Sequence, residues 1–411
     1  MALVVQKYGG TSVADIQMIK DVARRVIKTA KEGHQTIVVI SAMAGETDRL
    51  INLTHKICDQ PDGREYDSLV STGEQVSSAL LSMALQSMGQ QAISFLGHQI
   101  RIITDEDFSK ARIKNIDSEK ILDVLNQGKI VVVAGFQGVD KNNNITTLGR
   151  GGSDTTAVAL ASALKADICE IYTDVEGVYT TDPNICEEAR KLDRISYDEM
   201  LEMASLGAKV LHTRSVEFAK KYNVIIRVRS TFNDRSGTIV CKEDEKMERV
   251  VVSGVTYNKD EAKITISKIP DRPGIASLIF SSISEAGIIV DMIIQNVGAD
   301  GLASLTFTVP KSEMKKALSL TKKTIGKLGS GEIKGNENIA KVSIIGAGMR
   351  THAGIASKMF TALAKESINI KMISTSEIKV SCVIDDKYTE LAVRVLHDTF
   401  GLEKEDVKKE G

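Results

Sequence analysis

Cysteine is scarce in this sequence and follows no recognisable spacing. The five cysteines are scattered and odd in number, and none belongs to a C-x-x-C pair. A disulfide framework and a structural zinc site are therefore both disfavoured. We expect reduced cytosolic thiols that are mostly buried.

Long apolar runs are also missing. No stretch approaches the roughly 20 apolar residues that a membrane-spanning helix requires. The first residues contain no basic and then apolar leader with a cleavage site, so we expect a cytoplasmic protein. The net charge of -1 predicts no strong attraction to nucleic acid or to a membrane surface.

Several catalytic signatures are absent as well. The six histidines are dispersed, with no H-x-x-x-H pair and no Ser/His/Asp set, and we assign neither His212 nor His352 a catalytic role. Nothing predicts a covalent enzyme intermediate, and no direct metal ligand is assigned. The strict phosphate fingerprints G-x-x-x-x-G-K-[ST] and G-x-G-x-x-G do not occur.

What is present is a chain of 411 residues, enough for two or more domains. In the first 230 residues, strand-like apolar runs alternate with segments whose apolar residues recur at helical spacing. This alternation predicts a mostly parallel sheet covered on both faces. The expected strands are Leu3–Gln6, Thr36–Ile40, Lys129–Ala134, Ile168–Thr173 and Val224–Val228. The expected helices are Asp15–Lys31, Leu69–Met88, Ser118–Gln127, Asp154–Lys165 and Thr213–Tyr222. A charged run at 242–249 then indicates a solvated linker.

The C-terminal part contains an internal repeat. Two segments, which begin at Pro273 and Ala353, share Gly-Ile-Ala-Ser, a Phe, an Ile and Met-Ile in ungapped register. Each copy is typical of a strand, a glycine turn, a helix and a second strand. We therefore expect two small modules packed on each other, each covering the other's apolar sheet face.

KYGGTS, residues 7–12, is the first candidate for chemistry. It lies where a strand gives way to a helix, so backbone N–H groups, the helix dipole and Lys7 together favour an anion. Glycine also lets the backbone approach a ligand closely. A plain turn explains the same residues about as well.

TLGRGGSDTT, residues 147–156, also follows a strand region and opens a helix. Arg150 offers a planar fork suited to a carboxylate or phosphate. Gly151 and Gly152 expose backbone N–H groups, and Ser153 is placed to cap the helix. A glycine-rich turn with an N-cap is the alternative.

Two further stretches carry acidic side chains. STGEQ begins at Ser71, and its Glu74 is either part of a helix cap or the partner of a substrate ammonium. YTDVEGVYTTDP, residues 172–183, is turn-rich and follows a strand, but its spacing does not fit an EF-hand. Loops beyond strand ends in such sheets bind ligands, so a nucleotide base and ribose are candidates here.

These four stretches, in this order, resemble the signatures of the aspartate kinases, a branch of the amino-acid kinase superfamily. The resemblance covers essentially the whole chain and implies an α/β fold. It predicts a three-layer α/β/α catalytic domain with a mostly parallel sheet at 1–245. Two ACT-like βαββαβ modules follow in a regulatory region at 246–411, at about 262–335 and 340–411. The sequence departs from the family pattern in its short SAMAGETD loop and in Glu176, where Asp is commoner.

The resemblance implies phosphoryl transfer from ATP to the side-chain carboxylate of L-aspartate. The product, 4-phospho-L-aspartate, would enter lysine, threonine and methionine biosynthesis. No general base is needed because the attacking carboxylate is ionised at neutral pH. Lys7 would hold the transferring group, Asp154 would orient Lys7, and Mg²⁺ would bridge the phosphates. The ATP candidates are Lys7, Tyr8, Gly9, Gly10, Ser41, Thr173, Asp174, Tyr179, Asp182 and Lys209. The substrate candidates are Thr47, Glu74, Arg150, Gly151, Gly152 and Ser153.

The resemblance also implies inhibition by lysine, threonine or both, bound at ACT interfaces. The predicted effector residues are Asp271, Gly274, Ile275, Ala276, Gln295, Asn296, Thr351, Asn369, Ile370, Thr375, Ser376 and Glu377. A homodimer through the ACT modules is expected, or an α2β2 form if an internal start at Met247 yields a free regulatory subunit. Two alternatives stay open. One is a kinase for glutamate or a related acid, against which the repeat and STGEQ argue. The other is an amino-acid sensor without catalysis, against which the retained site residues argue.

Overall fold

The computed structural model describes residues 1–206, 210–244, 247, 250–298 and 301–404. The contacts divide the chain into two compact units. The first comprises Met1–Tyr179 and Lys191–Arg249, and the second comprises Thr180–Arg190 and Val250–Gly411. The short segment Thr180–Arg190 therefore leaves the first unit and joins the second.

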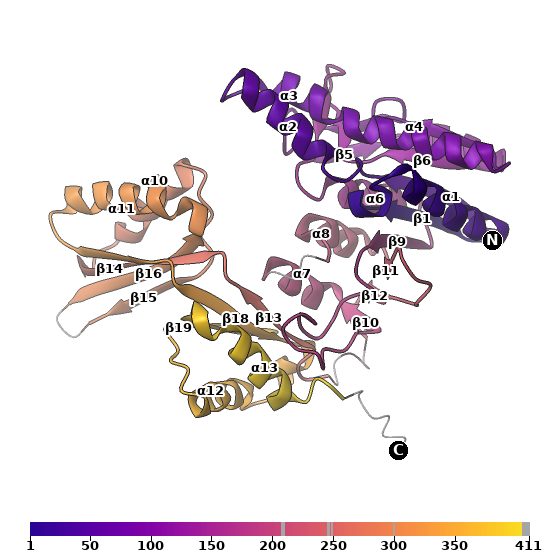
Figure 1. The fold of residues 1–411 in the computed structure, drawn as a ribbon. Coiled ribbons are helices and arrows are strands. Elements are labelled where there is room, and N and C mark those ends of the chain that lie inside the picture. Colours follow the sequence, from indigo (N-terminus) through magenta and orange to yellow (C-terminus); the bar gives the residue numbers. More distant parts are fainter. Residues whose placement is uncertain (207–209, 245–246, 248–249, 299–300, 405–411) are drawn as a thin grey trace. The chain divides into compact units, whose positions relative to one another are not determined.

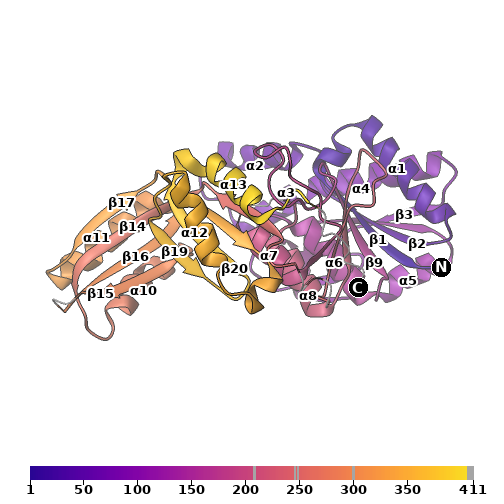
Figure 2. The same ribbon diagram turned by 90° about the horizontal axis from the view of Figure 1, so that it is seen from below.

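An eight-stranded sheet forms the middle of the first unit, in the order β10-β12-β11-β9-β1-β2-β6-β3 (Figures 1 and 2). All neighbouring strands are parallel except β11 and β12, which confirms the predicted mostly parallel sheet. The central strands are runs of Val and Ile because both of their faces are covered. The strands are β1 (Leu3–Tyr8), β2 (Gln35–Ile40), β3 (Ala92–Phe95), β6 (Ile130–Ala134), β9 (Ile168–Thr173), β10 (Arg194–Ser196), β11 (Ile226–Ser230) and β12 (Thr238–Cys241).

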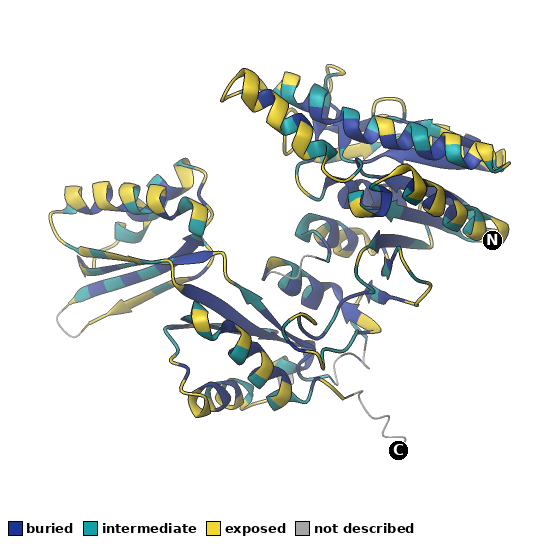
Figure 3. Cartoon of the chain, in the orientation of Figure 1, coloured by how far each residue is buried: buried dark blue, intermediate teal, exposed yellow. Residues whose placement is uncertain are grey.

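Helices cover both faces of this sheet, which confirms the predicted three layers. On one face, α1 (Ile16–Lys31) and α4 (Thr72–Ser87) share an apolar core with the strands. On the other, α6 (Gly152–Ala163) packs against β1, β2 and β9 and is buried along almost its whole length (Figure 3). Because side chains alternate along a strand, Tyr8 points toward α1 and Lys7 toward α6. Further helices of this unit are α2 (Glu46–Ile57), α3 (Gly63–Val70), α5 (Glu119–Asn126), α7 (Tyr197–Ser205) and α8 (Thr213–Tyr222).

The first unit also contains a small four-stranded sheet that the sequence did not predict. Its order is β5-β4-β7-β8, and α3 packs against β8. β8 leads directly into the loop that carries Arg150, so this small sheet fixes where that loop begins. Its strands are β4 (Ile102–Thr104), β5 (Ile113–Ile116), β7 (Gln137–Val139) and β8 (Ile145–Thr147).

The second unit contains the two predicted modules, each built on a four-stranded sheet. The first module has the expected βαββαβ order and the sheet order β15-β16-β14-β17. Its helices close an apolar core of their own. Its elements are β14 (Glu261–Pro270), α10 (Ile275–Glu285), β15 (Ile293–Val297), β16 (Leu302–Pro310), α11 (Met314–Leu328) and β17 (Glu332–Asn336).

The second module has the sheet order β13-β18-β20-β19. β13 (Gly254–Asn258) precedes the first module in the chain, yet it pairs with β18 of the second. The first module is therefore inserted between two paired strands, and a strand outside the predicted range 340–411 completes the second sheet. The other elements are β18 (Ile339–Ile345), α12 (Ile355–Lys365), β19 (Met372–Thr375), β20 (Lys379–Asp385) and α13 (Thr389–Phe400).

The internal repeat corresponds to equivalent structure in the two modules. Gly274 and Gly354 occupy the same place before α10 and α12, and both have left-handed φ angles, of 94° and 88°. A side chain is strained in this conformation, which explains why glycine recurs in register.

Four of the five free cysteines are buried and Cys58 is exposed, so the expectation of mostly buried thiols is confirmed. In the described part of the chain, no helix has the length and apolarity needed to cross a membrane.

Candidate active site

A cavity of about 470 Å³ lies at the carboxyl ends of β1, β2 and β6. It brings together three of the predicted motifs, which come from distant parts of the sequence. Its lining includes Lys7, Gly9, Gly10, Ser41, Thr47, Glu74, Arg150, Gly151, Gly152, Ser153 and Asp154. Ligands of open α/β sheets bind at this end of the strands, so the position fits a binding site.

Lys7 and Asp154 form an ion pair in this cavity. Nζ of Lys7 lies 2.6 Å from Oδ1 of Asp154, and each side chain is only 12% exposed. Lys7 ends its strand and Asp154 lies in the first turn of α6, so the pair joins the two anion loops. The carboxylate fixes the ammonium at a place where a phosphate could contact it.

Tyr8 is the predicted ATP residue whose side chain turns away from the cavity. It is fully buried, and its ring stacks on Tyr172 with centroids 4.6 Å apart. The Tyr8 hydroxyl donates to Gln6, and the hydroxyl of Tyr172 donates to the buried carboxylate of Glu170. Burial raises the pKa of Tyr8 well above its ordinary value. The ring therefore supports the loop from beneath.

The glycines of the two loops have distinct physical reasons. A Cβ on Gly10 would lie 2.9 Å from the carbonyl oxygen of Ala42, so the neighbouring loop can approach only glycine. Gly149 and Gly151 flank Arg150 and have left-handed φ angles of 74° and 71°. These angles make the sharp turn that leaves Arg150 exposed at the cavity.

The cap of α6 differs from the prediction. We expected Ser153 to cap this helix, but the helix begins at Gly152 and its N-cap is Gly151. The left-handed Gly151 places its own carbonyl to accept from the N–H of Thr155, so the helix starts before Ser153. The free N–H groups of this first turn, together with the helix dipole, favour an anion.

Glu74 has the most unusual environment of the lining. Its Oε1 accepts from the N–H of Ala42 at 3.1 Å, while its Oε2 is buried without a partner among the described residues. Burial raises the pKa of Glu74 to about 7. The cap interpretation is excluded because the carboxylate binds a different loop and makes no cap of α4. An ammonium group would satisfy the unpartnered oxygen.

The cavity also contains residues that sequence reasoning missed. Asp48, in the first turn of α2, lines it, as does Phe136, which follows the end of β6. Phe136 has a φ of 69°, unusual for a bulky residue. A Cβ on Gly152 would lie 2.8 Å from the Phe136 ring, so the ring packs on the start of α6. Its position after a buried strand was the one available signal.

The nucleotide candidates are dispersed. Thr173, Asp174 and Tyr179 lie at the end of β9 and in the loop beyond it, next to the end of β1. Asp182 belongs to the second unit, where its Oδ2 accepts from the hydroxyl of Tyr257 at 2.9 Å. Lys209 lies outside the described residues.

The effector candidates occupy equivalent places in the two modules. Gln295 and Asn296 lie on edge strand β15, and Thr375 and Ser376 lie at the end of edge strand β19. The turns before α10 and α12 and the ends of β15 and β19 hold most of the others; Asn369 and Ile370 precede β19, and the side chain of Thr351 lies outside the described residues.

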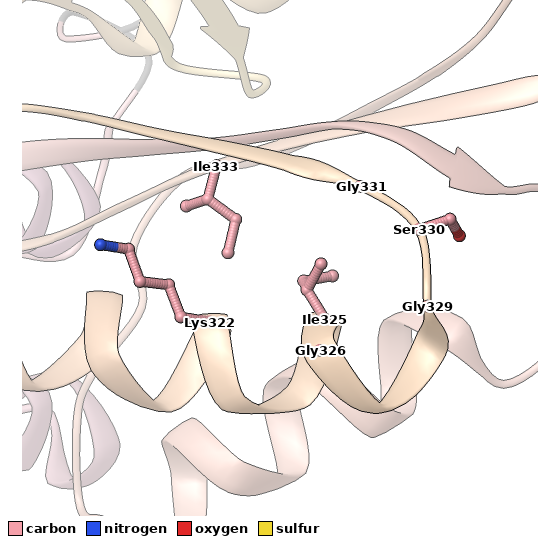
Figure 4. A pocket seen from close by; sticks show the side chains of 7 residues that line it. All are labelled: Lys322, Ile325, Gly326, Gly329, Ser330, Gly331 and Ile333. Carbon is pink, nitrogen blue, oxygen red and sulfur yellow. The ribbon is translucent and has the colours of Figure 1, made fainter.

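A separate cavity of about 380 Å³ lies between α11 and β17 (Figure 4). The side chains of Ile325 and Ile333 face each other across it, and Gly326, Gly329 and Gly331 complete much of its wall. The predicted effector residues lie elsewhere in the modules.

Comparison with known proteins decides the family. The amino acid kinase family model matches residues 2–230, and the ACT domain model matches residues 265–324 and 342–400. An aspartokinase of Pseudomonas aeruginosa is 58% identical over 405 residues, which are 98% of this chain and 98% of that protein. The chain belongs to the aspartate kinases.

Two solved structures of E. coli aspartokinase III share the fold of this aspartate kinase. One, in complex with aspartate and ADP, is 26% identical with a TM-score of 0.79, covering 97% of this chain and 99% of that one. The other, in complex with lysine and aspartate, is 27% identical with a TM-score of 0.78 and the same coverage. Membership in this family of enzymes removes the sensor without catalysis from the alternatives.

Proposed function

We propose that the chain transfers the γ-phosphoryl group of ATP to the side-chain carboxylate of L-aspartate, giving 4-phospho-L-aspartate and ADP. The observation that carries this proposal is the unpartnered, buried Oε2 of Glu74 in a cavity that also contains Lys7 and Arg150. These three groups suit an amino acid with an ammonium, an α-carboxylate and a reacting carboxylate. The structure of E. coli aspartokinase III with aspartate and ADP supports the same substrates.

Lys7 stabilises the phosphoryl group during transfer. Phosphoryl transfer requires positioning and charge stabilisation more than covalent chemistry, because the transition state spreads negative charge over the phosphoryl oxygens. Asp154 holds the ammonium of Lys7 in place, and the N–H groups of Gly9 and Gly10 add donors nearby. The substrate carboxylate is ionised at neutral pH and attacks without a general base.

Glu74 and Arg150 hold the two ends of aspartate that do not react. Glu74 takes the ammonium, and the guanidinium of Arg150 takes the α-carboxylate as a bidentate partner. The first-turn N–H groups at Gly152 and Ser153 favour the negative charge, and Thr47 is a further contact. This arrangement leaves the side-chain carboxylate free to face Lys7.

The nucleotide lies between the Lys7 loop and the loop after β9, with Thr173, Asp174 and Tyr179 beside the base and ribose. Asp182 and Lys209 complete this proposed nucleotide set. Mg²⁺ enters with ATP and neutralises charge on its phosphates. Mg²⁺ binds phosphates with one or two carboxylates and keeps several waters, and the isolated carboxylates of Asp48 and Asp154 in the lining fit that preference.

A panel of substrates tests this proposal. With MgATP, ADP release should occur with L-aspartate and stay at background with L-glutamate. Phosphorylation of glutamate but not of aspartate would favour the alternative kinase for a longer acid and contradict our proposal. The product is checked by trapping the acyl phosphate with hydroxylamine. It would supply the biosynthesis of lysine, threonine and methionine.

Lysine, threonine or both bind the second unit and shift an equilibrium between active and inhibited states. The lysine complex of E. coli aspartokinase III supports an effector of this class. The equivalent placement of effector candidates on β15 and β19 supports paired sites. Activity should fall with lysine, threonine or their mixture, and full activity in all three would contradict this regulation.

The assembly that we propose is a homodimer through the ACT modules. The edge strands leave apolar side chains exposed, with Ile293 at 53%, Val297 at 55% and Ile373 at 42%. Burying such edges is a common route to association. Light scattering on the full chain tests this, and a monomer at micromolar concentration would contradict it.

An internal start at Met247 would give a free regulatory subunit and an α2β2 assembly. Mass analysis of protein expressed from the untagged native gene tests this, and only full-length chain would count against it. The buried, unpaired thiols support a cytoplasmic location.

A further inference from the structure

Asp67 and Arg214 grip the same two chain segments from opposite sides, just before the Arg150 loop. One segment is 109–111, after β4, and the other is 147–148, at the end of β8. The segments are joined to each other by the N–H of Ala111, which donates to the carbonyl of Thr147 at 2.9 Å.

Asp67, on α3, takes the N–H groups of both segments. Its fully buried carboxylate accepts from the N–H of Ser109 at 2.9 Å and from the N–H of Thr147 at 2.7 Å. The hydroxyls of the same two residues also donate to it. Burial raises the pKa of Asp67, and these four donors oppose that effect.

Arg214, in the first turn of α8, takes the carbonyl groups of both segments. Its guanidinium donates to the carbonyl of Ala111 at 2.9 Å and to the carbonyl of Leu148. Its neighbour His212 packs on the same loop, because a Cβ on Gly151 would lie 2.2 Å from the Cγ of His212. The start of α8 therefore contacts the loop on both sides of Arg150.

Neither charge is compensated by an ion pair within the part of the chain that the structure describes. Main-chain dipoles stabilise them instead: N–H groups for the carboxylate and C=O groups for the guanidinium. Charge-assisted hydrogen bonds are shorter and stronger than neutral ones. They can hold a binding residue within the few tenths of an ångström that recognition requires.

We propose that Asp67 and Arg214 are positioning residues that set the approach of Arg150 to the substrate carboxylate. This rests on the proposed function, in which Arg150 binds aspartate. Gly149 and Gly151 give the loop its turn, but they do not restrain it, so the restraint comes from this clamp of Asp67 and Arg214. A loosened clamp therefore impairs aspartate binding more than it impairs ATP binding or the chemical step.

The test compares Asp67→Asn and Arg214→Lys with the full-length enzyme. Asparagine places an amide NH2 against an N–H donor, and lysine cannot span both carbonyls. An unsatisfied buried group of this kind should raise the KM for aspartate about tenfold. We expect kcat and the KM for ATP to stay within about twofold of wild type. Asp21→Asn and Arg24→Lys, in an exposed pair on α1, are matched controls without a main-chain clamp.

A double-mutant cycle separates positioning from a general structural effect. If Arg214 acts through Arg150, then Arg214→Lys should not raise the KM for aspartate further in an Arg150→Ala background. Equal effects of Arg214→Lys in both backgrounds, or parallel losses in kcat and both KM values, would overturn the clamp. Arg214→Ala assayed with and without low guanidinium ion is a second measurement. Rescue of the aspartate KM supports the clamp and failure of rescue opposes it.

The result for Arg150→Ala distinguishes the two proposals. An unchanged KM for aspartate in that variant would overturn the role of Arg150 and the clamp together. A raised KM in Arg150→Ala, with unchanged values in Asp67→Asn and Arg214→Lys, would overturn the clamp alone.

Discussion

Replacing Glu74 by glutamine should separate binding from stability. Glutamine has almost the same shape, and its oxygen can still accept from the N–H of Ala42. It removes the charge that we propose for the substrate ammonium. Removing one partner of a buried ion pair costs about 3 kcal/mol or more, which corresponds to a rise of at least about 100-fold in the KM for aspartate. The KM for ATP should change little.

The pH dependence gives an independent measure of the same group. Burial raises the pKa of Glu74 to about 7, so the carboxylate is protonated in the free enzyme below that pH. The KM of the wild-type enzyme for aspartate should therefore rise about tenfold from pH 8 to pH 6. Glu74→Gln should show a flat profile. An ADP-release assay at fixed MgATP measures both.

The stability of the same variant should move in the opposite direction. Because its pKa is raised in the folded state, Glu74 stabilises the fold below pH 4.5 and that stability is lost as the pH rises through 7. At pH 8 the ionised side chain costs the fold up to about 3 kcal/mol, which Glu74→Gln removes. A variant that is less stable at pH 8, or that binds aspartate within threefold of wild type, would refute the reasoning.

Three further predictions concern other parts of the chain. Lys7→Ala should lower kcat at least about 100-fold and leave effector binding intact, and near-normal turnover would contradict the role of Lys7. Gly151→Ala should raise the KM for aspartate at least about tenfold, because its Cβ would overlap His212. Gly128→Ala is the control, since Gly128 has the same φ and open space around it. Lys341→Met should lower the free energy of unfolding by about 3 kcal/mol because it leaves a buried carboxylate unpaired, and denaturant titration measures this.

Local patterns in the sequence located much of the site. KYGGTS and GRGGSD were found because glycines, an anion-binding side chain and a helix start are all consecutive. The helix Thr213–Tyr222 was predicted with its correct bounds because its periodicity is uninterrupted. The role of Glu74 stayed open because its partner, the N–H of Ala42, belongs to another loop.

The remaining features depend on pairings between distant residues. β13 is short and looks like part of a linker until its register with β18 is known. The small sheet that carries the Arg150 loop has strands too short to give a periodic signal. Asp67 and Arg214 are single charged residues, which a sequence pattern assigns to the surface, and only tertiary contacts show that both serve buried main chain.

The segment Thr180–Arg190 has a consequence for any shorter product of the gene. A chain that begins at Met247 would contain β13, and so both complete sheets, but it would lack this segment. The N–H of Val255 would lose the carbonyl of Thr180, which accepts from it at 2.7 Å, and Nε2 of His397 would lose the Thr180 hydroxyl at 3.0 Å. Short and full-length chains would then differ in whether this berth on β13 and α13 is filled. Hydrogen exchange at the Val255 amide would distinguish the two.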